Sequence, residues 1–149
     1  MYDFTEDFRA MSETLFQSEF GILYPTIKVQ WDDIPFDQPK DRWVAFTVNQ
    51  NPAKQATIGN RFIVRTTGYI QIDVMVAGEK GKLVEAKKIA EAAADIFAYR
   101  KFKGAQITLS CQEKHVTVAP TAGSFRRVMA RVFFYYDGER PLIPMATIP

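Results

Sequence analysis

The chain has 149 residues and a formal net charge of +2, with 47% hydrophobic and 24% charged residues. This composition is typical of one soluble globular domain and excludes a disordered or collagen-like chain. No apolar run reaches the roughly 18 residues that a membrane-spanning helix requires, and the acidic, aromatic N-terminus does not resemble a secretory signal. The single cysteine excludes an internal disulfide, and the single histidine leaves little for a zinc site.

The small net charge conceals an uneven distribution. Residues 1–50 contain nine acidic and four basic side chains, a net charge of −5, whereas the remainder contains eight acidic and fifteen basic side chains, a net charge of +7. Subunits that dock head to tail can use such a division, with an acidic surface against a basic one. The alternative is that both sets of charges are solvated, and the sequence leaves both interpretations open.

The first predicted element is an amphipathic helix over residues 3–19. Its apolar side chains recur at helical spacing, and the acidic side chains early in the segment suit the positive end of a helix dipole. The apolar positions are Phe4, Phe8, Met11 and Leu15. Gly21 is the predicted end of this helix, because glycine commonly terminates helices.

Two strands that flank a proline-rich loop follow the helix. Residues 27–31 alternate between apolar and polar side chains, which predicts a short strand, and residues 42–48 predict a second strand. The segment between them, residues 32–41, contains two prolines and four aspartates and is therefore a predicted loop. Residues 49–60 are polar and turn-prone, which indicates a long hairpin tip.

The strongest pattern in the chain predicts a third strand over residues 62–76. Apolar or small side chains alternate with polar ones along this whole segment, far beyond the usual strand length of about five or six residues. The inward positions are Phe62, Val64, Thr66, Gly68, Ile70, Ile72, Val74 and Val76. A glycine in the middle of such a strand predicts a bend or a β-bulge at Gly68.

A second helix and further strands complete the predicted elements. Gly78 separates the third strand from a helix over residues 80–99, and the alanines of this helix suit close approach to a sheet. Its inward positions are Leu83, Ala86, Ile89, Ala90, Ala93 and Phe97. Residues 105–110 and 114–119 predict two short strands, and residues 125–136 predict a last, long strand.

The order of these elements indicates the fold class. Short connections and alternating faces favour an α+β fold of two layers, with a mainly antiparallel or mixed sheet of about five to six strands and both helices packed on one face. We expect residues 1–137 to form this single domain. Residues 138–149 are expected to form an extended, proline-rich tail.

The last strand and the tail are more apolar than a closed two-layer fold requires. The outward side chains of the strand are Arg127, Met129, Arg131, Phe133 and Tyr135, and the apolar side chains of the tail are Leu142, Ile143, Met145 and Ile148. A groove on a neighbouring subunit would shelter such a tail from water. The alternative is a tail that folds back on its own domain.

Side chains suited to catalysis or metal binding are few. Cys111 and His115 could form a nucleophilic pair, but without an orienting third group a structural cysteine is the favoured interpretation. The aspartates of the proline-rich loop lack the spacing of a calcium-binding loop and are interpreted as solvated or partner-facing. The lysines and arginines at both ends of the second helix are accompanied by no nucleic-acid-binding motif. The sequence therefore predicts no enzyme, cofactor or metal site.

Two segments carry a resemblance to a known family. Residues 24–36, Tyr-Pro-Thr-Ile-Lys-Val-Gln-Trp-Asp-Asp-Ile-Pro-Phe, and residues 41–48, Asp-Arg-Trp-Val-Ala-Phe-Thr-Val, resemble the tail-terminator-like proteins of tailed bacteriophages. The Gly-Tyr-Ile-Gln-Ile-Asp-Val strand at residues 68–74, the alanine-rich helix and the late strand ending in aromatic residues are similar too. The resemblance covers residues 22–137, and its most distinctive part is the Trp-Asp-x-Ile-Pro-Phe stretch.

The resemblance implies a structural protein of the virion, in the tail or neck, that is assembled in the host cytoplasm and has no catalytic residue. Such proteins form a hexameric ring that caps the tail tube, ends its polymerisation and joins the tail to the head-side connector. The implied partners are further copies of the chain, the tail tube protein and the connector protein, but no membrane. Non-specific proximity to DNA in the lumen stays open. The alternatives are a head-side completion or joining protein and, in another class, a small α+β enzyme or ligand-binding domain.

A ring closed by rotation requires that two different patches of each subunit meet. In this chain we expect the patches to come from the aromatic residues at the proline-rich loop, the outward face of the last strand and the tail. The aromatic residues would anchor the loop over the sheet edge or against the next subunit. The expected interface residues are Trp31, Phe36, Trp43, Arg127, Arg131, Leu142, Ile143 and Met145.

Overall fold

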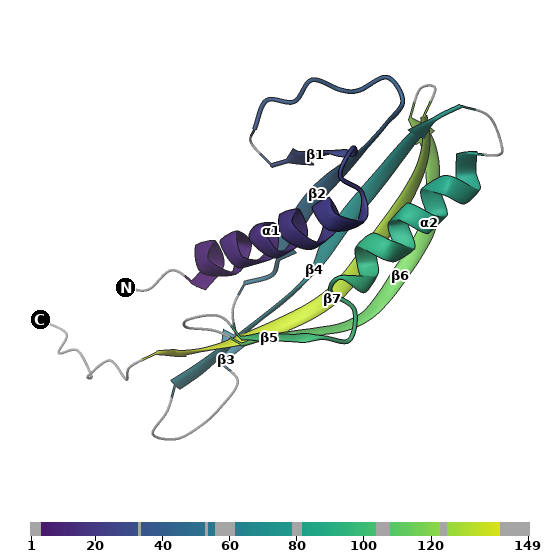
Figure 1. Cartoon of the computed structure of the whole chain (residues 1–149). Helices are drawn as coiled ribbons and strands as arrows, with labels where there is room; N and C mark the ends of the chain where they lie inside the picture. The colour runs from purple at the N-terminus through teal and green to yellow at the C-terminus, as the bar shows by residue number, and fades with distance from the viewer. Residues whose placement is uncertain are drawn as a thin grey trace, which may run out of the picture.

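The computed structural model describes residues 4–32, 34–52, 54–55, 62–78, 82–103, 108–122 and 125–140 (Figure 1). This part of the chain forms one sheet and two helices. In chain order the elements are α1 (Phe4–Leu23), β1 (Lys28–Trp31), β2 (Arg42–Gln50), β3 (Lys54–Gln55), β4 (Phe62–Ala77), α2 (Lys82–Asp95), β5 (Lys101–Lys103), β6 (Thr108–Ala122) and β7 (Phe125–Arg140).

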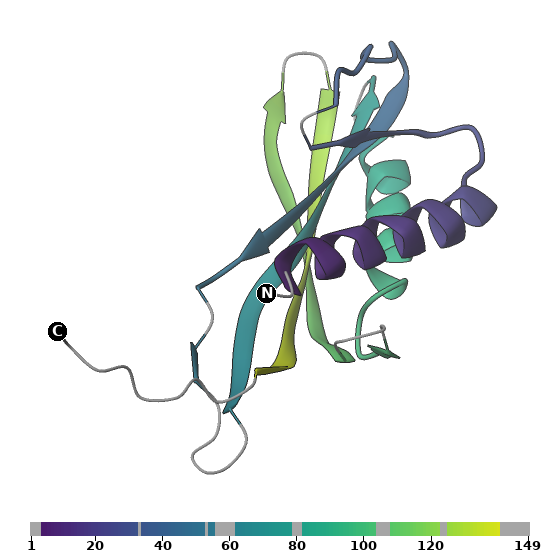
Figure 2. The same ribbon diagram turned by 90° about the vertical axis from the view of Figure 1, so that its left-hand side faces the viewer.

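The strands form one mixed sheet with the order β1-β2-β4-β7-β6-β5. The two-residue strand β3 also pairs with β4, beyond the end of β2, and brings the number of strands to seven. β1 runs parallel to β2, and the other described strand pairs are antiparallel. Both helices lie on the same side of the sheet (Figure 2), which confirms the predicted two-layer α+β fold.

The core lies between the helices and the sheet. The alternating pattern predicted for β4 is confirmed, because Thr66, Ile70, Ile72, Val74 and Val76 are all buried. They face the alanine-rich side of α2 and the aromatic side chains of α1, which bury apolar area from both layers. The remaining buried apolar side chains include Phe8, Phe16, Phe20, Val44, Phe46, Ile89, Phe97, Leu109, Val128, Val132, Phe134 and Tyr136.

β4 and β7 form the long central pair of the sheet. Their register runs without interruption from Phe62 opposite Arg140 to Ala77 opposite Phe125. β7 therefore continues four residues beyond the predicted end of the last strand at residue 136, into the segment expected to form a tail. Residues 141–149, with Leu142, Ile143 and Met145, lie outside the described residues.

The structure contradicts the helix end predicted at Gly21 and the β-bulge predicted, as an alternative to a bend, at Gly68. Gly21 lies inside α1, which continues to Leu23, so it does not end the helix. Gly68 lies in an uninterrupted ladder with β7 and forms no bulge. A Cβ at Gly68 would lie 2.0 Å from the carbonyl oxygen of Asn49, so the glycine allows β2 to approach closely.

The strands after α2 also differ from the prediction. Residues 108–110 and 114–119, from the two short strands predicted at 105–110 and 114–119, belong to one strand, β6. Residues 105–107 lie outside the described residues. The register of β6 with β7 shifts between Cys111 and Lys114 and between Ala119 and Ala122. These irregularities interrupt the alternation that identifies a strand in a sequence. The edge strand β5 was not predicted. Neither helix, over its described residues, is long and apolar enough to cross a membrane.

Candidate interface on the open sheet face

One face of the sheet is left uncovered by α1 and α2, as Figures 1 and 2 show together. We call this surface the open face. Alternate side chains of four strands project from it, because successive residues of a strand point to opposite faces. The side chains that we assign to it are Trp43, Thr47, Asn49, Arg65, Tyr69, Gln71, Asp73, Met75, His115, Thr117, Arg127, Met129, Arg131, Phe133 and Tyr135.

Aromatic rings and guanidinium groups pack against one another in the middle of the open face. The guanidinium carbon of Arg131 lies 4.5 Å from the ring centroid of Tyr69, and the Arg131 Nε donates to Gln71 at 3.0 Å. Phe133 lies between Tyr69 and His115, with centroid separations of 6.0 Å and 5.4 Å. A cation over an aromatic face and edge-to-face rings are both attractive, so these side chains are held in place before any partner binds.

A second cluster lies toward the end of β7. Arg65 donates to both carboxylate oxygens of Asp137, at 2.8 and 3.0 Å, and its guanidinium carbon is 4.3 Å from the ring centroid of Tyr135. The hydrogen bond to Asp137 raises the pKa of Arg65 above its usual value. This bidentate pair neutralises the positive charge where the cluster meets solvent.

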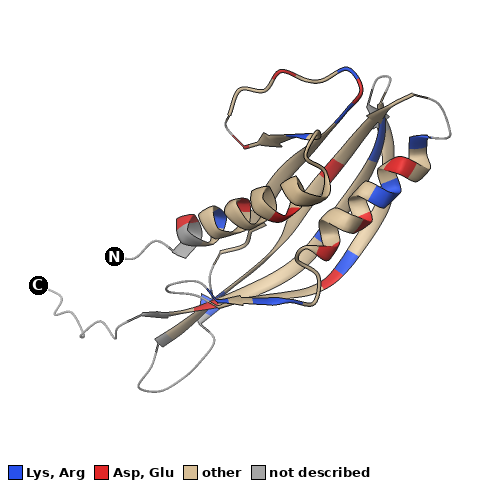
Figure 3. Ribbon diagram, viewed as in Figure 1, with Lys and Arg blue, Asp and Glu red and all other residues tan. Residues whose placement is uncertain are grey.

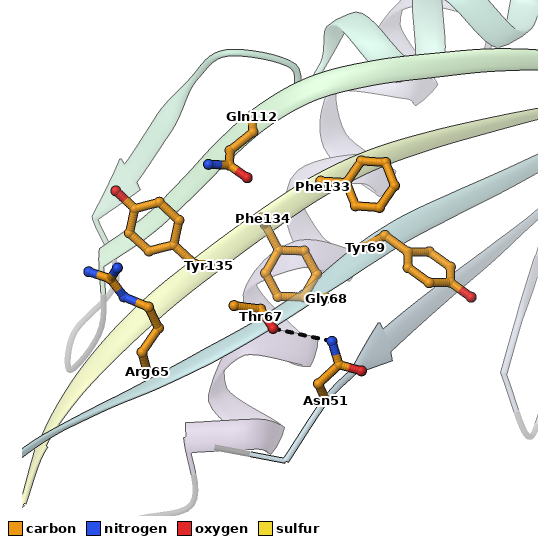
Figure 4. A pocket seen from close by; sticks show the side chains of 9 residues that line it. All are labelled: Asn51, Arg65, Thr67, Gly68, Tyr69, Gln112, Phe133, Phe134 and Tyr135. Atoms are coloured by element: carbon orange, nitrogen blue, oxygen red, sulfur yellow. Dashed lines mark hydrogen bonds between the residues drawn. The ribbon is translucent and has the colours of Figure 1, made fainter. Parts of the chain in front are cut away.

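Between the two clusters the open face contains a shallow depression with a volume of about 370 Å³ (Figure 4). Aromatic rings, a guanidinium group and amide side chains project around it, and Asn51 donates to Thr67 at 3.2 Å on one side. The lining residues are Asn51, Arg65, Thr67, Gly68, Tyr69, Gln112, Phe133, Phe134 and Tyr135. The lining combines aromatic rings with about as much polar surface, so it offers both stacking and hydrogen-bonding groups to a partner.

The other end of the open face contains two buried donors without an acceptor in the described part of the chain. These are Nε1 of Trp43 and Nε of Arg127. Arg127 also forms an ion pair with the largely buried Asp73, at 3.3 Å, and Gln71 donates to the same carboxylate at 3.1 Å. Buried donors are rarely left without a partner, so this end of the face has unused hydrogen-bonding capacity.

The structure separates the three aromatic residues expected to act together at the proline-rich loop. Phe36 of the loop packs against Trp43 of β2, with ring centroids 5.4 Å apart, on the open face. Trp31 points to the helix side, where it packs edge-on against Phe16 and Phe46 at 6.1 and 5.5 Å. Trp31 is therefore a core contact, whereas Phe36 and Trp43 hold the loop against the open face.

The structure does not bring Cys111 and His115 together as a nucleophilic pair. Cys111 is buried among core residues, and this burial raises the pKa of its thiol to about 12, despite a smaller, opposite effect of Arg100. His115 is exposed and packs against Phe133 on the open face. A register shift of β6 separates the two residues. The buried thiol stays protonated and unreactive near neutral pH.

Both charge signs occur on each helix (Figure 3). Ion pairs link the acidic first part of the chain to the rest within one subunit. Glu19 of α1 pairs with Arg100 at 3.0 Å, and Arg42 of β2 pairs with Glu85 of α2 at 2.7 Å. Of these two pairs, Glu19–Arg100 joins an acid of the acidic part to a base of the basic part, whereas Arg42–Glu85 has the opposite sense. The described residues contain no group of three side chains that could hold a metal ion.

Arg127 and Arg131 lie on the open face, as expected for outward residues of the last strand. Sequence reasoning missed Tyr69 and Arg65 as candidates, although they occupy outward positions of the same period-two pattern in β4. Their neighbours across the register are Phe133 and Asp137. The register of a long-range strand pair, which places these residues together, cannot be read from either strand alone.

Comparisons with known proteins agree with this architecture. A family model described as phage tail terminator protein matches residues 9–132. One solved structure is similar over 96% of this chain and 100% of that chain, with a TM-score of 0.62 and 16% sequence identity, which shows a shared fold. None of the curated proteins compared with the chain matches it. Because the family model extends from α1 into β7, the chain belongs to the phage tail terminator protein family and is a structural protein of a bacteriophage tail.

Proposed function

We propose that this protein forms a ring, with six subunits, that caps the tail tube, ends its polymerisation and joins the tail to the head-side connector. Membership of the tail terminator family supports the location in the tail. The observation that carries the ring is the open face, where Tyr69, Phe133 and Tyr135 lie outside the helical layer. Aromatic and arginine side chains are enriched in protein interfaces.

A ring closed by rotation requires a heterologous contact, in which the open face meets a different surface of the next subunit. The helices lie on the opposite side of the sheet and give each subunit two unlike sides (Figure 2). The tail tube protein and the connector protein would then bind the two rims of the ring.

Electron microscopy of lysates from a phage that lacks this protein tests the terminator role. The expected result is tails of abnormal length without heads, and their restoration to normal length when the protein is supplied from a plasmid. Normal tails beside completed heads would instead assign the protein to the head side of the joint and contradict the proposal.

Native mass spectrometry of the purified chain tests the ring. The expected species is a hexamer, with a ring visible end-on by negative staining. Some rings close only on their partner, so the same measurement is made after addition of isolated tail tubes. A chain that is monomeric alone and adds no ring to a tube end would contradict the proposal.

A further inference from the structure

We infer that residues 141–149 of one subunit bind in the depression on the open face of the neighbouring subunit. The inference rests on the proposed ring and adds the identity of the segment that occupies the depression.

The sequence of the segment suits an aromatic surface. Residues 141–149 read Pro-Leu-Ile-Pro-Met-Ala-Thr-Ile-Pro, so that Pro141 and Pro144 are separated by two aliphatic residues. Proline-rich segments of this spacing adopt an extended helix with solvated carbonyl groups, and aromatic-lined grooves recognise them because little conformational entropy is lost. The depression supplies three such rings, from Tyr69, Phe133 and Tyr135. The amide side chains of Asn51 and Gln112 can donate to the carbonyl groups.

The direction of the chain favours the neighbouring subunit. β7 passes the depression at Phe133 and Tyr135 and continues away from it to Arg140, in register with Phe62. A residue before proline is kept extended, and this applies to Arg140 and again to Ile143. β7 therefore ends beyond the depression of its own subunit, at the residue that precedes the nine residues 141–149. When extended they reach roughly 28 Å, at about 3.1 Å per residue, which is enough to cross a subunit boundary.

The charges near the depression favour an uncharged occupant. Arg65 is already neutralised by two hydrogen bonds to Asp137, and Arg131 is engaged by Gln71 and stacked on Tyr69. An acidic peptide or a phosphate chain would have to displace these contacts. Residues 141–149 contain no charged side chain and leave the contacts intact.

Disulfide cross-linking of the full chain tests the inference. Two single variants, Ile143→Cys and Tyr69→Cys, are mixed in equal amounts, assembled, oxidised and separated on a non-reducing gel. The expected product is a linked dimer, at a yield at least tenfold above that of the matched control. In the control Ile143→Cys is mixed with Val84→Cys, because Val84 is exposed on α2, on the other side of the sheet. The native Cys111 is buried and contributes little.

A peptide of residues 140–149, added in excess before oxidation, should lower the dimer yield. The same peptide with Leu142→Ser and Ile143→Ser should not, and this comparison involves no change to the protein. An equal yield from the Val84→Cys mixture, no dimer from the Tyr69→Cys mixture, or equal competition by both peptides would overturn the inference.

Failure of the inference is distinguishable from failure of the proposed function. Full-length chain with Leu142→Ser and Ile143→Ser is compared with the unmodified chain by native mass spectrometry. Weaker rings in the variant, seen as dissociation at lower collision energy, support the inference. Rings of equal stability overturn the inference while the proposed ring stands. If the unmodified chain forms no ring in solution or on tubes, both fail.

Discussion

Gly68 of β4 lies directly against the backbone of Asn49 in β2: a Cβ at residue 68 would be 2.0 Å from the Asn49 carbonyl oxygen and 2.9 Å from Cζ of Phe134. Backbone atoms of a central strand cannot move aside as the end of a flexible side chain can. The contact is also the point at which the pairing of β2 with β4 ends, at Gln50 opposite Gly68.

Gly68→Ala should therefore destabilise the protein by about 3 kcal/mol, because it overpacks the sheet where the backbone is closest. Urea unfolding followed by circular dichroism measures the free energy of unfolding. Gly21→Ala is the matched control, since a Cβ at residue 21 meets nothing within 4 Å and lies in α1. This control should gain about 0.5–1 kcal/mol. Equal stability of the two variants would contradict the prediction.

The pKa of Cys111 predicts a pH dependence of stability. Burial raises the thiol pKa from 9.0 to about 12 in the folded protein. Above pH 9 the unfolded chain releases this proton while the folded chain keeps it, so the free energy of unfolding falls as pH rises, by up to about 1.4 kcal/mol per pH unit. Between pH 8 and 10 the free energy of unfolding, measured with urea, should fall less steeply with pH for Cys111→Ala than for the unmodified protein. Parallel declines would contradict the prediction.

Lys114 links β6 to the C-terminal half of α2. Its ammonium group lies 2.7 Å from Glu91 and 2.5 Å from Asp95, and hydrogen bonds to both carboxylates raise its pKa. Lys114→Met should cost about 0.5–1 kcal/mol, as expected for a partly exposed pair, and the cost should shrink in high salt. The control is Lys101→Met, because Lys101 is exposed on β5 and has no ion pair among the described residues. The unfolding midpoints of both variants are measured in low and in high salt. If salt does not change the loss of stability caused by Lys114→Met, the substitution removes packing rather than an electrostatic attraction.

The two tryptophans should respond differently to substitution by phenylalanine. The buried indole N–H of Trp43 has no acceptor in the described structure. Burial of such a group costs about 1–3 kcal/mol, so the gain from its removal in Trp43→Phe offsets the loss of buried ring area. Its net effect should be within about 0.5 kcal/mol. Trp31→Phe should cost about 1–2 kcal/mol, because the ring packs against Phe16 and Phe46 in the core. The free energy of unfolding of both variants, measured by chemical denaturation, tests this prediction. A larger loss of stability in Trp43→Phe than in Trp31→Phe would show that the indole N–H of Trp43 has an acceptor.

Patterns local in sequence predicted the core of this fold well. The period-two run in β4 and the helical stripe of α2 identified buried residues such as Ile72 and Ala90, because burial of one face imposes the repeat directly. The interpretations of the glycines failed because a glycine in a sequence is compatible with several structural roles. At Gly68 the need is close approach of another strand rather than a bulge, and only the register between β2 and β4 shows this.

The candidate interface was predictable in part. Arg127 and Arg131 were identified because outward positions in a long strand are readily counted. Trp31 lies apart from Phe36 and Trp43, because the parallel pairing of β1 with β2 turns its ring toward α1. Its role at an interface stays a prediction. The pairs Tyr69–Phe133 and Arg65–Asp137, around which the two clusters form, join residues more than sixty positions apart, and no local pattern contains such contacts.

The position of β7 also determines when a newly made chain can fold. This strand comes last among the described elements, yet it lies between β4 and β6 in the middle of the sheet. Until residues 125–140 are synthesised, β6 can pair only with the three-residue strand β5 and β4 has one bare edge, so the apolar layer beneath α2 cannot close. Pairing of strands so distant in sequence is slow compared with helix formation. The open face, which needs β7 for its rings and guanidinium groups, would thus form only after residues 125–140 have been made, so that a chain without them could not take a place in an assembling tail.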